Sequence, residues 1–111
     1  MTVTAKPLVS AKEAETLQTT QYTAPAGTRV ILDKVTGTNT GASSAQLSFN
    51  LVPNGGSAGA SNTVVKTKTL GAGECYTFPE IVGHVLSPGD FVSTLASAAS
   101  VTIRISGREV T

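Results

Sequence analysis

Apolar and polar residues alternate along several short segments of this chain. The two clearest sets of alternating apolar residues are Leu47, Phe49, Leu51 and Val101, Ile103, Ile105. Successive side chains of a strand point to opposite faces, so a period of two predicts a strand with one buried face. The other face of each strand is left for water or for a partner.

Turn-forming residues separate these segments and divide the chain into a series of strands. We expect strands at residues 17–22, 29–39, 45–52, 63–70, 74–78, 91–95 and 101–106, with the last extending to residue 110. About seven or eight strands with closely spaced turns and no room for crossover helices predict an all-β fold, an antiparallel β-sandwich. The pattern leaves jelly-roll and immunoglobulin-like strand orders open.

Residues 1–16 differ in composition from the rest of the chain. We therefore predict that they form an N-terminal arm next to a sandwich domain at residues 17–111. The arm is polar and small, with Pro7 as its rigid point, and Ser10–Glu13 has the spacing of a capping box that would start one helical turn. Removing residues 2–16 should then leave the domain folded.

A second segment, Pro79–Leu86, also breaks the alternating pattern. Ile81, Val82, Val85 and Leu86 recur at helical spacing after a proline in a first-turn position. This spacing predicts a short helix or 3₁₀ turn that plugs one end of the sandwich.

The composition sets limits on partners. The 111 residues suit one domain, and the aromatic share of 5% predicts a core of aliphatic side chains. Eight Lys and Arg against seven Asp and Glu provide no basic face for a run of phosphates, so we expect no direct nucleic-acid binding. A charged fraction of only 14% favours a chain that sits against neighbours, as in a homo-oligomer.

The single cysteine, Cys75, cannot form an internal disulfide. In a strand it is expected to be a small buried hydrophobe, which suits folding in a reducing cytoplasm. The first ten residues lack the pattern of an export signal. The sequence also contains no apolar run long enough to predict a membrane span.

The residues that carry chemistry are few. His84 is the one imidazole and is expected to be packed or hydrogen-bonded; a catalytic triad with Asp90 lacks the nucleophile-elbow motif. Glu74 and Glu80 could form the pair of carboxylates that a glycosidase needs. Against this, the chain has no Trp and only two Tyr that could stack on sugar rings. We therefore expect a non-enzyme with no catalytic, metal or cofactor site.

Two further patterns concern the surface. The segment PNGGSAGASN, residues 53–62, is too poor in apolar residues to order itself by burial and is the best candidate for a contact loop. Lys66 and Lys68 are two residues apart and should share one strand face, where lysines guard a sheet edge; an ionic contact to an acidic neighbouring subunit is the alternative.

Three phrases of the sequence resemble small β-sandwich virion proteins of tailed bacteriophages, such as capsid decoration or cement subunits and minor tail or head-tail components. The phrases are TTQYTAPAGTRVILDKVTGTNT at residues 19–40, LVPNGGSAGASN at 51–62 and LGAGECYTFPEIVGHVLSPGDFVS at 70–93. The resemblance implies a partner such as the major capsid protein or another virion subunit, and a place in the virion after folding in the host cytoplasm.

The resemblance and the residues together favour a decoration or cement subunit on the outside of the phage capsid. A ring subunit of the tail, baseplate or head-tail junction is the alternative, and a host-surface or carbohydrate-binding module is an alternative of another class. Loops commonly present the contact residues of a rigid scaffold. We therefore take the candidate partner-binding residues from the long loop, from the turn before residue 91 and from the arm around Lys12. They are Lys12, Asn54, Gly55, Gly56, Ser57, Ala58, Gly59, Pro88, Gly89 and Asp90.

Overall fold

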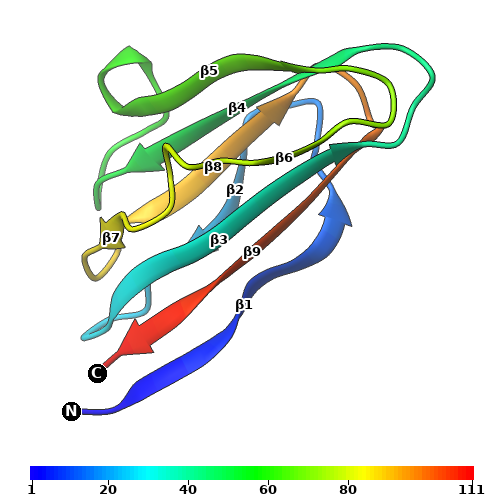
Figure 1. Ribbon diagram of the computed structural model, residues 1–111. Helices are drawn as coiled ribbons and strands as arrows, with labels where there is room; N and C mark the ends of the chain where they lie inside the picture. The colour runs from blue at the N-terminus through cyan, green and yellow to red at the C-terminus, as the bar shows by residue number, and fades with distance from the viewer.

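A computed structural model describes residues 1–111 and consists of nine β-strands and one 3₁₀ turn (Figure 1). The strands are β1 (Val3–Glu13), β2 (Thr19–Thr23), β3 (Arg29–Asn39), β4 (Ala45–Val52), β5 (Thr63–Leu70), β6 (Cys75–Thr77), β7 (Val85–Leu86), β8 (Phe91–Ala96) and β9 (Val101–Val110). The 3₁₀ turn η1 (Ala60–Asn62) precedes β5. The all-β class predicted from the alternation is confirmed.

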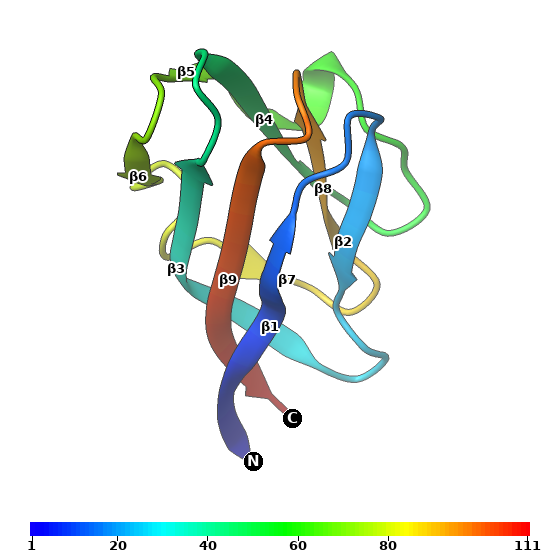
Figure 2. The same ribbon diagram turned by 90° about the vertical axis from the view of Figure 1, so that its right-hand side faces the viewer.

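The strands form two antiparallel sheets that pack as a sandwich (Figures 1 and 2). Sheet A has the order β1-β9-β3-β6, with β7 also paired to β3, and sheet B has the order β2-β8-β4-β5. The pairs are nested: β1 with β9, β2 with β8, β3 with β6 and β7, and β4 with β5. This is the winding of a jelly roll, which resolves the strand order that the periodicity left open.

The core lies between the sheets and is mostly aliphatic, as the composition predicts. Its side chains come from alternate positions of the strands, including Leu47 and Phe49 of β4 and Ile103 and Ile105 of β9, all fully buried. The ring of Phe78 contacts Phe49 edge-on, with centroids 4.9 Å apart. Edge-on contacts of this kind add to the stabilisation from apolar burial.

The segment predicted as an arm, residues 1–16, contains the edge strand β1. It pairs with β9 from Val3↔Val110 to Glu13↔Thr102, and Val9 and Ala14 are buried against the core. The helical turn expected at Ser10–Glu13 is wrong. Two register shifts let this polar stretch keep pairing, and the ladder satisfies backbone groups of β9 that would otherwise face water.

Two successive turns replace the short helix expected between residues 79 and 86. The backbone N–H groups of Ile81 and Val82 donate to the carbonyl of Phe78, and Gly83 then takes a positive φ of 90°, which ends any helical run. Ile81 is nevertheless fully buried, so the segment does plug the sandwich. The 3₁₀ turn of this chain lies elsewhere, in the loop before β5.

The free edges of both sheets are poor templates for another strand. Strand β1 carries Pro7 and two register shifts, and β5 is broken by a bulge at Thr67, whose φ is 48°. Strands β6 and β7 are only three and two residues long, and β2, the other edge of sheet B, has five residues and a register shift between Thr20 and Tyr22. Such features discourage edge-to-edge pairing, so faces and loops remain the surfaces on which a partner can dock.

No helix of the structure combines the length and the apolar character that crossing a bilayer requires.

Candidate docking surfaces

The loop at residues 53–62 folds back over the outer face of sheet B and is pinned there by Asn50. The Asn50 side-chain amide, 4% exposed, donates to the Gly59 carbonyl at 3.1 Å, to Asn62 Oδ1 at 2.8 Å and to Thr63 Oγ1 at 3.0 Å. Buried amides are costly unless bonded, so this network fixes the loop against the sheet.

Further bonds within the loop complete its order. The N–H of Gly56 donates to the Pro53 carbonyl at 2.9 Å, and the side-chain amide of Asn62 donates to the Ser57 carbonyl at 2.9 Å. Asn62 Oδ1 also accepts the N–H of Gly59 at 3.0 Å. Hydrogen bonds rather than apolar burial therefore hold this small-residue loop in one shape.

The turn at residues 87–90 lies directly beside this loop. Asp90 accepts the N–H of Ser87 through Oδ2 and the N–H of Asn54 through Oδ1, both at 2.9 Å. Gly89 has a φ of 87°, and the position that a Cβ would occupy lies 2.5 Å from Asn54 Cγ, so the Asn54 side chain packs directly against the Gly89 backbone. The predicted residues Asn54, Gly55, Gly56, Ser57, Ala58, Gly59, Pro88, Gly89 and Asp90 thus form one surface, which we call the loop end.

Lys12 is not part of that surface. It pairs in register with Ile103 near the other end of β9, and in Figure 1 the arrowhead of β1 and the turn between β4 and β5 lie on opposite sides of the molecule. Its ammonium contacts Glu15 at 2.9 Å. The hydrogen bonds from Gln21 and Lys12 lower the pKa of Glu15 below its ordinary value. The sequence-based candidate set is therefore divided between two ends of the sandwich.

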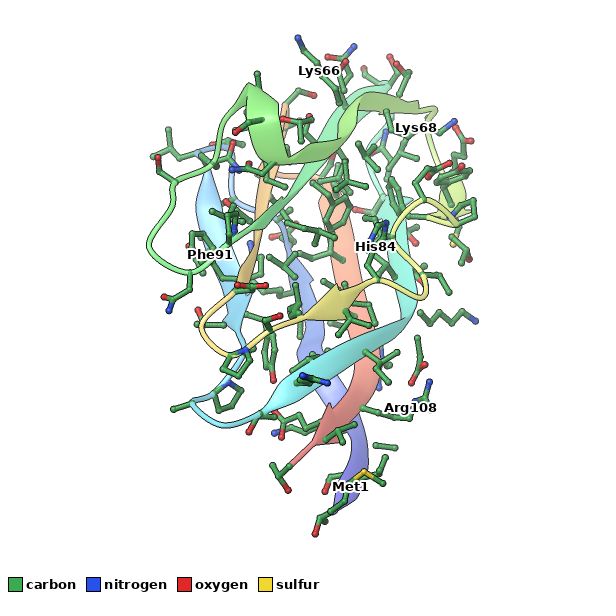
Figure 3. The ribbon with its side chains drawn as sticks, turned by 90° about the vertical axis from the view of Figure 1, so that its left-hand side faces the viewer. Met1, Lys66, Lys68, His84, Phe91 and Arg108 are labelled. Atoms are coloured by element: carbon green, nitrogen blue, oxygen red, sulfur yellow. The ribbon has the colours of Figure 1, made fainter.

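Cys75 and His84 both differ from the sequence-based expectation. Cys75 is exposed, because Tyr76 takes the inward position of β6 and packs edge-on against Phe78 at 4.8 Å. His84 is also exposed, and its side chain makes no hydrogen bond; Figure 3 shows it beside the chain that enters β7. The sequence around Cys75 predicted a strand with alternating faces. It did not show whether Cys75 or the larger Tyr76 would face the core.

Lys66 and Lys68 do not share a strand face. The bulge at Thr67 shifts the register of β5, so the two lysines leave the strand in different directions (Figure 3). The Lys68 ammonium lies 4.4 Å from the centroid of the Tyr76 ring, a cation–π contact between β5 and β6. Lys66 borders the outer face of sheet B.

Sequence reasoning missed an open hollow of about 360 Å³ on the outer face of sheet B. Half of the ten residues that line it carry an amide or a hydroxyl, and Leu95, 37% exposed, is among the others. The alternation of β4 does place Ser48 and Asn50 outward, so the face was predictable. The loop that borders it was not, because its return over the sheet depends on Asn50.

A second open hollow, about 370 Å³, lies where the loop end meets β7. His84 and Asp90 both border it, together with Asn62 and Val85. Asp90 already accepts two backbone N–H groups. Its carboxylate is therefore committed to holding the turn rather than to orienting the imidazole for catalysis.

A polar cluster closes the sandwich where β2 meets sheet A. The Tyr22 hydroxyl donates to Glu109 Oε2, and the Lys6 ammonium lies 3.4 Å from Glu109 Oε1. The bond from Tyr22 lowers the pKa of Glu109 against the opposing effect of burial, and Lys6 adds to the lowering. Burial, followed by the same hydrogen bond, raises the pKa of Tyr22. This cluster joins the sheets and leaves Glu109 ionised.

The paired carboxylates considered for catalysis are also engaged in local bonds. Glu74 accepts the N–H of Gly71 at 2.7 Å, and Glu80 accepts the hydroxyl of Tyr76 at 3.1 Å. No group of three His, Cys, Asp or Glu residues is arranged to hold a metal ion. No protein-family model, curated protein or solved structure matches this chain.

Proposed function

We propose that this protein is a structural subunit of a tailed-phage virion that docks on the outside of the assembled capsid and stabilises it. The observation that carries the proposal is the loop end, in which two segments distant in sequence are held together by Asn50 and Asp90. A contact surface that is rigid before binding loses less conformational freedom when it docks. The partner is the major capsid protein or another virion subunit.

The proposed stabilisation comes from many copies rather than from one strong contact. Each sandwich is small, with extents of 45 × 26 × 19 Å, so its contact with one shell subunit is limited in area. A homo-oligomer placed on a symmetry axis of the shell binds several subunits at once, which multiplies the effective affinity. The guarded strand edges keep free copies from joining strand to strand before they reach the particle.

The test is the presence and copy number of the chain in particles produced by the phage or prophage that encodes it. Quantitative mass spectrometry of purified particles should find hundreds of copies, as for a shell component. A count of about six or twelve would place the chain in a tail or junction ring instead. Absence from particles that are otherwise complete would refute both positions.

A matched pair of variants separates the loop end from the rest of the surface. Ser57→Glu adds a carboxylate to the exposed loop, and Ser44→Glu adds the same side chain to the turn between β3 and β4 at the opposite end. The first variant should reduce particle occupancy about tenfold, while the second stays near wild type. Equal occupancy of the two variants would show that the loop end is not part of the docking surface.

The hollow on sheet B favours a second candidate, a carbohydrate-binding module. Its border of amides and hydroxyls offers donors and acceptors for sugar hydroxyls, and Leu95 offers an apolar contact. A glycan array with the purified protein tests this candidate. Signal that is lost in Leu95→Glu and kept in Ser57→Glu would favour it over the virion role.

A further inference from the structure

The outer face of sheet A gathers half of the cations of this chain. The inward side chains Ile103 and Ile105 of β9 are fully buried, so Arg104, Ser106 and Arg108 point outward. The register places Thr36 opposite Arg104, Lys34 opposite Ser106, and Arg29 opposite Val110. The four cations of this face are Arg29, Lys34, Arg104 and Arg108, out of eight Lys and Arg in the sequence.

Few anions balance these cations. Asp33, at the bulge of β3, forms a bidentate pair with Arg108, with Arg108 Nη2 to Asp33 Oδ1 at 2.9 Å. Glu13 stands opposite Thr102 on the edge strand β1. Arg29, Lys34 and Arg104 form no ion pair. Three unpaired cations therefore spread along the face over most of the length of β3.

This face is also the less covered of the two outer faces. The loop at residues 53–62 folds over sheet B, whereas in Figure 2 no segment passes in front of β1 and β9. Exposed apolar side chains lie among the cations: Val3, 51% exposed, pairs with Val110, and Val85, 55% exposed, pairs with Ile31. Mixed apolar and cationic surface of this kind suits contact with another protein.

We propose that the outer face of sheet A docks on an acidic protein surface, which under the proposed function is the outer surface of the capsid shell. This inference rests on the proposed function and names the chemistry of the partner. Charge complementarity selects the occupant, since an anionic surface is attracted to Arg29, Lys34 and Arg104 and a second copy of the same face is repelled.

Nucleic acid is a poorer occupant for this face. Single strands bind where bases stack on aromatic side chains, and the nearby Tyr76 and Tyr22 are engaged with Phe78 and Glu109 instead. Duplex DNA is bound by neutralising many phosphates, and a net charge of +1 with three unpaired cations on the face is too little.

A pair of charge-matched variants tests the proposal on purified particles. Arg104→Glu reverses a charge on sheet A, and Lys66→Glu makes the same change of net charge on the outer side of sheet B. Both side chains are exposed, so the thermal unfolding midpoint should stay near wild type in each. The proposal expects Arg104→Glu to lower the affinity for particles stripped of the protein about tenfold, and Lys66→Glu to change it less than about twofold.

Salt and competitors complete the test. Wild-type binding should weaken as sodium chloride is raised, because salt screens exposed charges, and a polyglutamate peptide should compete better than duplex DNA of equal charge. Equal effects of the two variants, or stronger competition by DNA, would overturn the assignment of this face. Wild-type protein that does not bind particles at all would overturn the proposed function, and the inference with it.

Discussion

Gly107 is a single position at which the backbone of sheet A leaves no room for a side chain. A Cβ there would overlap the carbonyl oxygen of Ile31 on β3 and would lie 2.8 Å from a methyl of Leu8 on β1. The bulge at Asp33 brings β3 close at this point. Glycine is therefore required by packing, although nothing in the alternating pattern of β9 marks it.

Gly107→Ala should lower the free energy of unfolding by about 2 kcal/mol or more, since backbone atoms must move to make room. Urea denaturation of the purified variant measures the loss. Gly59→Ala is the matched control: its added Cβ has no neighbour closer than 4.0 Å and its φ of −169° suits any residue. Similar losses for the two variants would show that the close approach of β3 is not what constrains Gly107.

The cluster of Tyr22, Glu109 and Lys6 predicts a pH dependence of stability. The folded state holds the pKa of Glu109 below its ordinary value of 4.5, so the folded protein keeps the carboxylate ionised where the unfolded chain takes up a proton. The stabilisation is present above that value and is lost as the pH falls through the folded pKa.

Urea midpoints measured between about pH 6 and pH 3 should therefore fall less steeply in Glu109→Gln than in the wild type. Tyr22→Phe, which removes the donor, should also flatten the profile. Glu13→Gln is the control, because Glu13 is exposed and forms no side-chain hydrogen bond. A wild-type slope in both Glu109→Gln and Tyr22→Phe would mean that the cluster does not stabilise the fold.

At the scale of elements, the hydrogen bonds of Asn50 decide whether the loop at residues 53–62 is a fixed surface. Asn50→Ala removes all three bonds to the loop and should lower the free energy of unfolding by about 1–3 kcal/mol. Hydrogen exchange of the amides of residues 56–62 should accelerate more than that of the rest of the chain.

Gln46→Ala is the matched control for this loop. Gln46 is on the same strand and the same face, is exposed, and its side chain makes no hydrogen bond. Its substitution should leave both the stability and the exchange of the loop near wild type. Loop exchange that is unchanged in Asn50→Ala would contradict the view that this side chain holds the loop.

Strands with a buried face were predictable because burial imposes a strict period of two. The predicted ranges 29–39, 45–52 and 63–70 coincide with β3, β4 and β5. Strand β1 was not predictable, since it is polar and buries little besides Val9. Its pairing depends on the open edge of β9, which is a property of the tertiary fold.

The surface was harder to predict than the strands. A bulge at Thr67 separates Lys66 from Lys68, and the inward turn of Tyr76 exposes Cys75. The loop residues of the proposed docking surface were chosen from their composition alone, and their role stays a prediction. The contact between this loop and the turn at residues 87–90 was not predicted, because the hydrogen bond from Asn54 to Asp90 joins residues 36 positions apart.

At the scale of the whole molecule, the first strand is part of the fold. The sequence alone predicts that a chain without residues 2–16 stays folded, but this deletion exposes the edge of β9 and removes the buried Val9 and Ala14. Burying a valine side chain contributes roughly 1.5–3 kcal/mol, and the lost ladder adds to this. The truncated chain should therefore unfold or aggregate at room temperature.

Circular dichroism and size-exclusion chromatography of the truncated chain measure this outcome. Val3→Ala, at a half-exposed position of the same strand, should unfold near the wild-type temperature and elute as the wild type does. A truncated chain that melts cooperatively near the wild-type midpoint would return residues 1–16 to the status of an arm.

We propose that this jelly roll binds a phage shell through preformed surfaces. Cryo-electron microscopy of particles that carry the protein tests it most directly. We predict density for the sandwich on the outside of the capsid, with the loop end and the outer face of sheet A in contact with shell subunits. Complete particles without that density, or density confined to the tail, would contradict the account.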